Sequence, residues 1–400
     1  MSRILCVWEL GADLGHIVLY HRLARQLKER GQEVVFALRD VSEAQALLGA
    51  DGFVWFQAPT WLGRIAQAPP EPVSYAEILQ AFGYDDADGL LSMVKAWRAL
   101  FWALDPDLIL FEHAPTALLA ARGLHRPRIV IGNGFSIPPS VSPLPSFRPW
   151  AKVSTQRLRE SEERVLRTVN RVLARLDEPP LRALFELLHA EETFLCTFPE
   201  LDHYPQRAGV EYAGPIFGLS DGVSPAWGSA GAKRIFAYLK PRYERFEECV
   251  AALARMPGDV LIYSPGVSAR IIARYQTARL RFGVTPYGMG AVEECDLGIC
   301  HGGFNTTAAF LLAGKPVVIL PMQLEQFLLA HYLQQQGLAR LIERNTGLAA
   351  IERIIRGTLE QEGLANRACV FAEKYRDYRV SETVERLADR CLRHLSNPPL

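Results

Sequence analysis

The sequence has no excess of charge of either sign. Lysine plus arginine and aspartate plus glutamate each number 44 in 400 residues, so the formal net charge at pH 7 is zero. The chain also lacks a basic stripe with interleaved aromatic residues, the pattern that nucleic-acid-binding proteins present to phosphates. We therefore expect no nucleic acid among its partners.

Long hydrophobic runs and a cysteine framework are missing as well. No window reaches the roughly 18 apolar residues of a membrane-spanning helix, and residues 1–8 lack the charged region and apolar core of a signal peptide. The seven cysteines are scattered, without a Cys-x-x-Cys pair or a metal-type Cys/His spacing. These absences favour a reduced, cytoplasmic protein with no transmembrane segment and no metal site, and they leave peripheral contact with a membrane open.

The chain is rich enough in apolar residues for two hydrophobic cores. Its 400 residues with 49% hydrophobic content exceed what one core usually supports. Short apolar strands, expected to be buried on both faces, alternate with helical segments, which is typical of doubly wound α/β proteins. The expected strands are 4–8, 33–38, 53–56, 107–111, 128–132 and 193–196 in the first half, and 234–238, 259–263, 280–284, 297–300, 316–320 and 339–342 in the second.

Composition also divides the chain. We expect a first domain at 1–213, a linker rich in glycine and small residues at 214–231, and a second domain at 232–380. A last helix at 381–400 is expected to pack back on the first domain. No internal sequence repeat is visible, although both halves have the same alternating architecture.

Helix signals accompany the strands. A helix is expected at 17–30, where Gly31 ends it, and another is expected to open at a Ser42-x-x-Gln45 capping box. Residues 151–189 carry arginine and glutamate at helical spacing and are expected to form helices with an exposed, ion-paired face.

The stretch at 295–326 has the pattern of an anion-binding turn. Residues 297–300 form a short apolar strand, and the Gly302-Gly303 pair after it lets the backbone turn tightly and approach a ligand. The sequence thus places a glycine turn at the carboxyl end of a buried strand.

A helix is expected directly after this turn. Thr306 and Thr307 would start it with hydroxyl groups, and Gly314 would end it. The N-terminus of a helix presents free N–H groups and a partial positive charge, worth about 0.3–1 kcal/mol for an exposed anion. The natural ligand of such a turn is a phosphate group.

A second strand at 316–320 leads to Pro321, Glu325 and Gln326. Successive strands of a parallel sheet end at the same edge, so Glu325 and Gln326 are expected beside the anion site. A carboxylate that accepts from hydroxyl groups, next to an amide that both donates and accepts, suits a sugar.

These residues resemble the donor-binding motif of nucleoside-diphosphate-sugar glycosyltransferases with the GT-B fold, in which His-x-Gly-x-x-Thr/Ser is followed by Pro-x-x-x-Asp-Gln. The matching residues here are His301, Gly303, Asn305, Thr306, Pro321, Glu325 and Gln326. The resemblance implies two doubly wound Rossmann-like domains that face a cleft. It also implies a donor site formed by His301, Gly302, Gly303, Asn305, Thr306, Thr307, Glu325 and Gln326.

A histidine in the first half has the right place for a general base. His16 follows Gly15 in a polar loop after the first strand. Residues 11–36 are similar to the Gly-His-containing segment of family 1-type glycosyltransferases, such as UDP-glucosyl- and glucuronosyltransferases, where that histidine is the catalytic base. The resemblance implies this role for His16, with Gly15 at the substrate, and an ordinary imidazole accepts protons at neutral pH. The alternative is a helix-capping or core histidine.

Glu112 is the candidate partner of this base. A base histidine works best with its other nitrogen tied to a carboxylate. Glu112 stands at the carboxyl end of the expected strand at 107–111, where the resembling enzymes often carry an acidic residue. His113 as the partner and a simple loop carboxylate at Glu112 are the alternatives.

Residues 59–104 and the proline-rich stretch at 136–149 interrupt the alternation. Their aromatic residues are either core residues beneath a long loop or a wall of the acceptor pocket. Asp86-x-Asp88 resembles the metal-binding DxD of the other main glycosyltransferase fold, but it lacks the strand context and is interpreted as solvated charge.

Departures from the family pattern leave the donor's identity open. Ala309 stands where many relatives place a Glu for the ribose, and Val284 stands where plant relatives stack the base on Trp. Glu325 replaces the Asp that faces the sugar. Lys240 is either a contact of the diphosphate or a surface lysine.

The sequence therefore predicts a glycosyltransferase. It would move a sugar from a nucleoside diphosphate donor, UDP or dTDP, to a hydroxyl of a small-molecule acceptor, with inversion and without a metal or other cofactor. The alternatives are a sugar-nucleotide epimerase or hydrolase of the same fold, or a non-catalytic nucleotide-sugar-binding partner protein.

Overall fold

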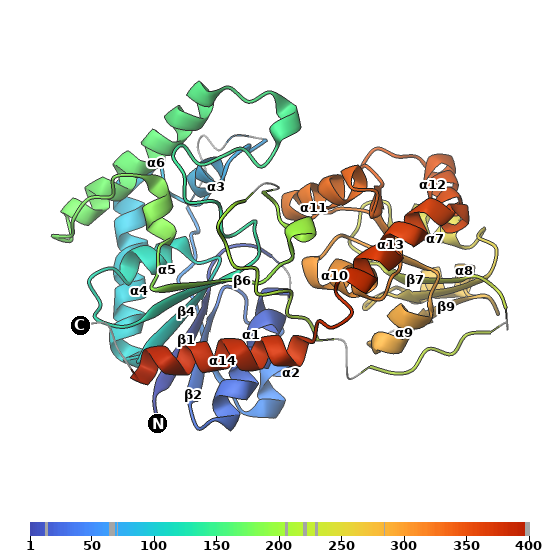
Figure 1. Ribbon diagram of the computed structural model, residues 1–400, viewed down its shortest axis with the longest axis horizontal. Coiled ribbons are helices and arrows are strands. Elements are labelled where there is room, and N and C mark those ends of the chain that lie inside the picture. The colour runs from blue at the N-terminus through green and yellow to red at the C-terminus, as the bar shows by residue number, and fades with distance from the viewer. Residues whose placement is uncertain are drawn as a thin grey trace. The chain divides into compact units, whose positions relative to one another are not determined.

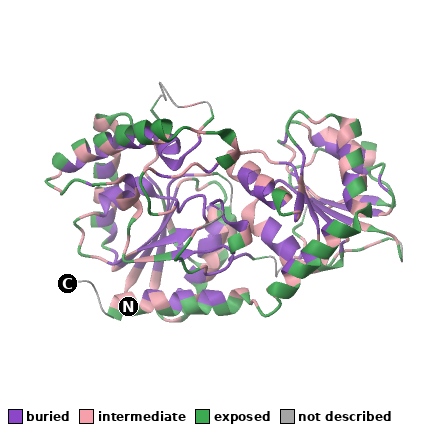
Figure 2. Ribbon diagram, turned by 45° about the horizontal axis from the view of Figure 1, so that its top comes forward, coloured by how far each residue is buried: buried purple, intermediate pink, exposed green. Residues whose placement is uncertain are grey.

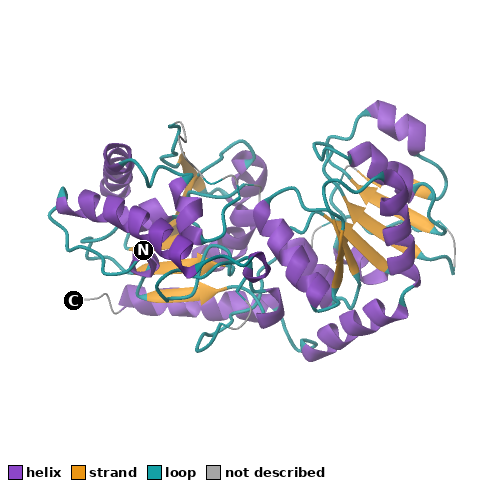
Figure 3. Cartoon of the chain, turned by 90° about the horizontal axis from the view of Figure 1, so that it is seen from above, coloured by secondary structure: helices purple, strands orange, loops and turns teal. Residues whose placement is uncertain are grey.

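The chain folds into two compact units (Figure 1). The computed structural model describes residues 1–12, 15–63, 69, 71–204, 207–218, 222–228, 231–283 and 285–396. The first unit consists of Met1–Ile216 together with Val380–Leu400, and the second of Phe217–Arg379. Each unit is built around one parallel sheet that is flanked by helices (Figure 3).

The sheet of the first unit has six parallel strands in the order β3-β2-β1-β4-β5-β6. They are β1 (Arg3–Trp8), β2 (Glu33–Leu38), β3 (Val54–Gln57), β4 (Leu108–Glu112), β5 (Arg128–Gly132) and β6 (Glu192–Leu195). Its helices are α1 (Gly15–Glu29), α2 (Ala44–Leu48), α3 (Tyr75–Gln80), α4 (Ala87–Leu104), α5 (Pro115–Ala120), α6 (Thr155–Ala174) and α14 (Val380–Ser396).

Helix α14 returns from the end of the chain to the first unit, where it lies beside α1 (Figure 1). Leu387 and Cys391 of α14 are fully buried in the same hydrophobic core as Ile17 and Tyr20 of α1. Burial of such side chains stabilises the packed helix by about 1.5–3 kcal/mol each.

The second unit repeats the same plan. Its six parallel strands follow the order β12-β11-β10-β7-β8-β9. They are β7 (Arg234–Tyr238), β8 (Asp259–Tyr263), β9 (Leu280–Gly283), β10 (Leu297–Cys300), β11 (Val317–Ile319) and β12 (Ala339–Leu341). The helices are α7 (Phe246–Leu253), α8 (Ala269–Tyr275), α9 (Met289–Glu294), α10 (Phe304–Leu312), α11 (Leu324–Gln335), α12 (Leu348–Glu360) and α13 (Glu362–Lys374).

In both sheets the order in which strands are added reverses at the same place. In the first unit the first strand, β1, lies beside the fourth, β4; in the second unit β7 lies beside β10. Ligands of open α/β sheets bind outside the carboxyl ends of the strands at such a switch point. The fold therefore marks the residues after β1 and β4, and those after β7 and β10, as the places to search.

Most strands are buried, as the apolar runs predict (Figure 2). The expectation of burial on both faces is wrong for β3, where Val54 is 53% and Phe56 39% exposed. This strand is the edge of its sheet, so one side has no neighbouring strand to cover it.

One helix start is predicted wrongly, and one helical stretch is confirmed only in part. The Ser42 hydroxyl caps no helix, because α2 begins only at Ala44 with Glu43 at its N-cap; Ser42 lies in a local turn, where its N–H donates to Asp40 Oδ1. At 151–189 a single long helix, α6, is followed by a turn and a short 3₁₀ helix at Leu184–Leu188. Among the helices of the described residues, none has both the length and the apolar character that crossing a bilayer requires.

Candidate functional site

His16 and Glu112 meet at the switch point of the first sheet. His16 is the second residue of α1, just after β1, and Glu112 is the last residue of β4. His16 Nδ1 lies 2.6 Å from Glu112 Oε2, and the two side chains are only 12% and 5% exposed. An ionised carboxylate only accepts hydrogen bonds, so the proton of the neutral imidazole lies on Nδ1 and Nε2 carries the lone pair.

Trp8 lies against the face of His16. Trp8 and Glu112 are register partners in the pairing of β1 with β4, so both end at the same level of the sheet. The indole and imidazole rings stack with centroids 4.9 Å apart and an interplanar angle of 19°. The carboxylate and the indole therefore fix both the edge and the face of the imidazole.

Tyr20 fixes the helix that carries His16. It lies one turn further along α1, on the same face. Its hydroxyl group is 2.8 Å from the carbonyl oxygen of Val7 on β1 and 2.9 Å from that of Leu110 on β4 and can donate to either. Burial raises the pKa of Tyr20 well above its ordinary value, so the hydroxyl stays protonated and remains a donor.

His113 is not the partner of His16. Its ring centroid is 6.3 Å from that of His16, while Glu112 occupies Nδ1. His113 adopts a left-handed backbone conformation with φ 43°, and its carbonyl oxygen accepts from the Leu10 N–H at 2.9 Å. Burial lowers the pKa of His113 well below its ordinary value and keeps the ring neutral.

Glu9 is a second buried carboxyl group next to this site. Its Oε2 accepts from the N–H groups of Thr116 and Ala117 at 2.9 and 3.1 Å. Desolvation by burial nevertheless raises the pKa of Glu9 to about 7, although these hydrogen bonds oppose the rise. Glu9 therefore changes charge near neutral pH.

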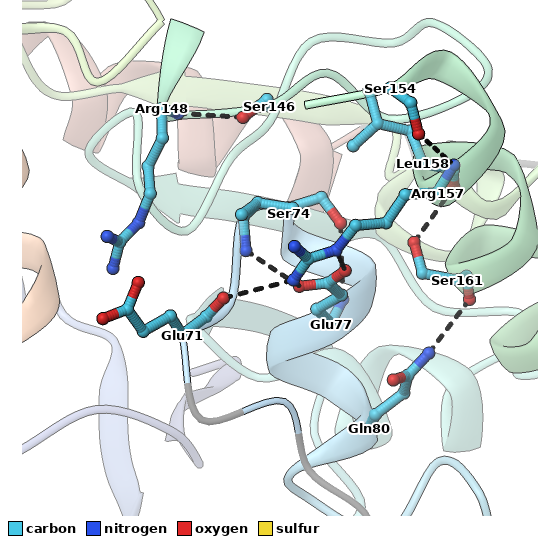
Figure 4. A network of polar contacts seen from close by, with 11 residues as sticks. Glu71, Ser74, Glu77, Gln80, Ser146, Arg148, Ser154, Arg157, Leu158 and Ser161 are labelled. Atoms are coloured by element: carbon cyan, nitrogen blue, oxygen red, sulfur yellow. Dashed lines mark hydrogen bonds and ion pairs between the residues drawn. The ribbon is translucent and has the colours of Figure 1, made fainter. Parts of the chain in front are cut away.

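One aromatic residue of the segment 59–104 lies beside His113. Tyr75, the first residue of α3, lies with its ring centroid 5.9 Å from that of His113. Helix α3 is clamped to α6, because Arg157 donates to Glu77 through Nε at 2.7 Å and through Nη2 at 2.9 Å (Figure 4). Tyr75 is fully buried, as the core interpretation expects, and the acceptor-wall interpretation stays a prediction.

Asp86 is part of a helix cap. Its Oδ1 accepts from the N–H groups of Asp88 and Gly89 at the start of α4. This contact accounts for Asp86 as an ordinary N-cap.

His301 joins three strand ends at the switch point of the second sheet. Its Nδ1 lies 2.8 Å from the Leu320 carbonyl oxygen after β11, and its Nε2 accepts from the Lys240 N–H at 2.8 Å after β7. A carbonyl only accepts and an amide N–H only donates, so these two contacts require a neutral ring with the proton on Nδ1. The backbone of Lys240 thus contributes to this arrangement.

The glycine turn has the shape that the sequence predicts. Gly302 has φ 79°, and a Cβ there would come within 2.7 Å of Ile319, so no larger residue fits. A Cβ on Gly303 would meet nothing within 4 Å. Gly303 therefore faces open space at the N-terminus of α10.

The predicted hydroxyl start of α10 is wrong. The helix begins at Phe304 with Gly303 at the N-cap, where no side chain makes a capping bond. Thr306 and Thr307 lie in the first turn, together with Asn305. Thr307 is buried, and its Oγ1 lies 3.7 Å from Cys300 Sγ. The first N–H groups of a helix have no partners within it, so the anion-binding character belongs to the backbone here.

Glu325 and Gln326 lie in the first turn of α11. Gln326 is buried, and its Oε1 accepts from the Met322 N–H at 2.8 Å, which fixes the loop after β11. Glu325 is half-buried. Gln326 thus has a structural role that the motif alone did not indicate.

Aromatic rings gather at the carboxyl ends of β7 and β8. Tyr238 and Tyr263 stack with centroids 5.1 Å apart, and Tyr287 meets Tyr263 edge to face at 6.3 Å. Tyr243 lies with its ring 5.1 Å from that of His301. Val284 lies outside the described residues.

Sequence reasoning missed Trp8 and Tyr243. Both are aromatic residues whose sequence context is that of ordinary core positions. The available signal was their place, because Trp8 is the last residue of β1 and Tyr243 lies in the connection between β7 and α7, where rings reach the ligand edge of the sheet.

Comparisons with known proteins bear on the fold and the enzyme class. No family model matches the chain. The PGL/p-HBAD biosynthesis glycosyltransferase of Mycobacterium tuberculosis is 25% identical over 403 residues, which cover 89% of this chain and 85% of that protein. The zeaxanthin glucosyltransferase of Pseudescherichia vulneris is 25% identical over 387 residues, covering 90% and 92%.

Solved structures share the fold along nearly the whole chain. The glycosyltransferase of kitacinnamycin superposes with a TM-score of 0.72 at 20% identity, covering 98% of this chain and 99% of that one. The glycosyltransferase VinC, solved in complex with dTDP, gives a TM-score of 0.67 at 18% identity, covering 97% and 100%. The chain is thus a glycosyltransferase with the GT-B fold, similar to the nucleotide-sugar-dependent enzymes of family 1.

Proposed function

We propose that the protein transfers a sugar from a UDP- or dTDP-sugar to a hydroxyl group of a small-molecule acceptor. The observation that carries this proposal is the buried His16–Glu112 pair at 2.6 Å, placed where the first sheet changes direction. The glycine turn before α10 occupies the same place in the second sheet. One unit thus supplies a base, and the other supplies an anion site.

His16 is the proposed base for the acceptor. Its Nδ1 faces Glu112, so Nε2 accepts the proton of the acceptor hydroxyl while the oxygen attacks the anomeric carbon. Glu112 holds the ring in the reactive tautomer and stabilises the imidazolium that forms. The bond from the anomeric carbon to the diphosphate oxygen breaks, and the proton remains on His16 until it is released to solvent.

The N-terminus of α10 is the proposed site of the leaving diphosphate. Its free N–H groups and partial positive charge favour an anion, and Gly303 leaves room for one. His301 serves this site by tying the loops after β7, β10 and β11 together. The complex of VinC with dTDP, a protein of the same fold, supports a nucleoside diphosphate as the ligand.

Sugar recognition is assigned to Glu325, to the amide nitrogen of Gln326 and to Asn305 and Thr306. The Gln326 Oε1 is engaged by Met322, so its Nε2 is the group that donates to a sugar hydroxyl. The reaction inverts the anomeric carbon, because a base on the acceptor favours direct displacement of the diphosphate from the opposite side. A helix N-terminus neutralises the leaving group, so no divalent metal is required.

Thermal shift with sugar nucleotides tests the donor site. UDP-glucose or dTDP-glucose at 100 times its dissociation constant should add about 2.7 kcal/mol to the free energy of unfolding. The added stability should be largely lost in His301→Ala, measured against that variant's own melting curve, and kept in His331→Ala, a half-buried histidine of α11. If no UDP- or dTDP-sugar raises the melting temperature, the assignment of the donor site is wrong.

Product analysis separates the proposed transfer from the alternatives. A transferase releases nucleoside diphosphate faster when a hydroxyl acceptor is added. An epimerase would change the sugar while it remains on the nucleotide, and a hydrolase would release diphosphate at a rate independent of acceptor. A binding protein without catalysis would shift in melting temperature but turn over no donor.

A further inference from the structure

We propose that Trp8, the last residue of β1, and Gly11, in the loop after it, are positioning residues for His16. The face of the Trp8 ring stabilises the charged imidazolium. Gly11 has no side chain that would clash with the imidazole. This inference rests on the proposed role of His16 as the base.

Trp8 is held so that its face stays on His16. The indole is 1% exposed, and its Nε1 donates to the Leu10 carbonyl oxygen at 2.6 Å. The Leu10 N–H in turn donates to the His113 carbonyl oxygen, which ties the loop to the end of β4. With this edge fixed, the ring stays stacked on the imidazole at 4.9 Å.

The stacking has a chemical consequence when His16 takes a proton. The face of an indole carries negative electrostatic potential and attracts a cation within about 6 Å of its centroid. Glu112 acts on the same imidazolium through Nδ1. Because Trp8 and Glu112 are register partners on adjacent strands, one level of the sheet supplies both contacts.

The other titratable groups around His16 are the same in the wild type and in any Trp8 variant. Burial lowers the pKa of His113 and raises those of Glu9 and Tyr20. Among the described residues, the groups from neighbouring elements are Glu112 at the end of β4, His113 after it, Glu9 after β1, Tyr20 on α1 and Arg39 after β2. A change seen on replacing Trp8 is therefore a change in the contact of the indole with His16.

Gly11 acts by having no side chain. A Cβ at Gly11 would lie 2.4 Å from His16 Nε2 and 2.7 Å from its Cε1, closer than real Cβ atoms approach. Gly11 also has φ 93°, a conformation that other residues rarely adopt. Any larger residue would push the imidazole away from Trp8 and Glu112.

The test of Trp8 follows the His16 ring directly by NMR. In protein labelled at its nine histidines, the His16 signals are assigned by their loss in His16→Gln, and their shift is followed against pH. Trp8→Leu should lower the midpoint of the His16 titration by about 0.4–1.5 pH units, since the imidazolium loses its aromatic support. Trp8→Phe, which keeps a ring and fills more of the site, should give a smaller decrease.

Trp102→Leu is the control, because Trp102 is 86% exposed on α4. It should leave the midpoint unchanged. The role of Trp8 is overturned if the His16 midpoint in Trp8→Phe and in folded Trp8→Leu equals or exceeds the wild-type value. If Trp8→Leu does not fold, Trp8→Phe alone decides.

The test of Gly11 uses a matched glycine. Gly31 also has a positive φ, 82°, but a Cβ there would meet nothing within 4 Å. Gly11→Ala should shift the His16 Cε1–H resonance, because the ring moves relative to the indole, whereas Gly31→Ala should leave it in place. An unmoved resonance in Gly11→Ala overturns the role of Gly11.

These measurements need no substrate, so they can contradict the roles of Trp8 and Gly11 without contradicting the proposed function. Loss of the donor-induced melting shift would overturn the donor site while the His16 titration still reported on Trp8. In the active protein, Gly11→Ala should lower the rate of nucleoside diphosphate release and keep the donor-induced melting shift.

Discussion

At the scale of the residue, the proposed chemistry depends most directly on His16. His16→Ala should lower the rate of nucleoside diphosphate release by about 10²–10⁴-fold, the usual contribution of a general base, and keep the donor-induced melting shift. Glu112→Gln should lower the rate less, because the Glu112 carboxylate orients the base and does not itself take the proton. His21→Ala, on the same helix but paired with Asp51, should retain the wild-type rate. A wild-type rate in His16→Ala would exclude it as the base.

Glu9 predicts how stability depends on pH. In the folded protein its pKa is raised from 4.5 to about 7, so the folded state keeps this proton while the unfolded chain loses it. The folded state therefore binds more protons between these values, and the contribution of Glu9 to stability falls as pH rises. Glu9→Gln cannot ionise, so relative to the wild type it should gain up to about 3 kcal/mol between pH 5 and pH 8.

Urea unfolding at both pH values measures this gain. Glu29→Gln, an exposed position on α1, is the control and should show no such change. The comparison with the wild type at each pH cancels His113, whose lowered pKa makes stability fall toward acid pH instead. A Glu9→Gln difference that is constant from pH 5 to pH 8 would contradict the raised pKa of Glu9.

Single residues were predictable from the sequence where their place follows from a strand end. Glu112 was one candidate partner of His16, because it ends a strand where the resembling enzymes often carry an acidic residue, and the contact at 2.6 Å selects it over His113. Trp8 was not predictable, since an apolar ring at the end of a buried strand has the same pattern as a core residue. The ring contacts of His301 were not foreseeable either, because they depend on backbone atoms from β7 and β11.

At the scale of the element, the strands were predictable and the helix starts were not. Short, continuous apolar runs identify strands well because burial dominates their composition. A cap depends on which N–H groups remain unsatisfied. Glu43 stands at the N-cap of α2 and Gly303 at that of α10, so the hydroxyl groups expected to start these helices make no capping bond.

The contact of α3 with α6 gives a testable prediction about how α3 is held. Glu77 is 3% exposed and receives two hydrogen bonds from Arg157, which is itself 46% exposed. Arg157→Ala leaves a buried carboxylate with a lost partner and should lower the free energy of unfolding by about 1–3 kcal/mol. The value stays below that of a fully buried pair because water reaches Arg157.

Arg167→Ala on the same helix is the control. Arg167 and its partner Glu163 are 62% and 64% exposed, so this change should alter the free energy of unfolding by less than about 0.5 kcal/mol. Equal effects of the two substitutions in urea unfolding would show that the Glu77–Arg157 contact does not hold α3 in place.

At the scale of the whole molecule, the two units repeat one strand order without a visible sequence repeat. The first carries the candidate base at its switch point, and the second carries the glycine turn. The alternation of strands and helices made this fold predictable. The sequence could not supply the nucleobase, because Ala309 and Val284 depart from the family pattern.

Metal independence is a property of the whole reaction. With the diphosphate held by the N-terminus of α10, turnover should be unchanged after treatment with EDTA. The rate of nucleoside diphosphate release with and without EDTA measures this. A loss of rate that manganese or magnesium restores would mean that a metal stabilises the leaving group.

The central claim is direct displacement of the diphosphate by an oxygen that His16 deprotonates. Real-time proton NMR of the cleavage of an α-linked UDP- or dTDP-glucose, with water as the acceptor, reports the anomer that forms before mutarotation. The account predicts that β-glucose appears first with the wild type and that its formation slows about 10²–10⁴-fold in His16→Ala. Initial release of α-glucose, or equal rates in the two proteins, would contradict it.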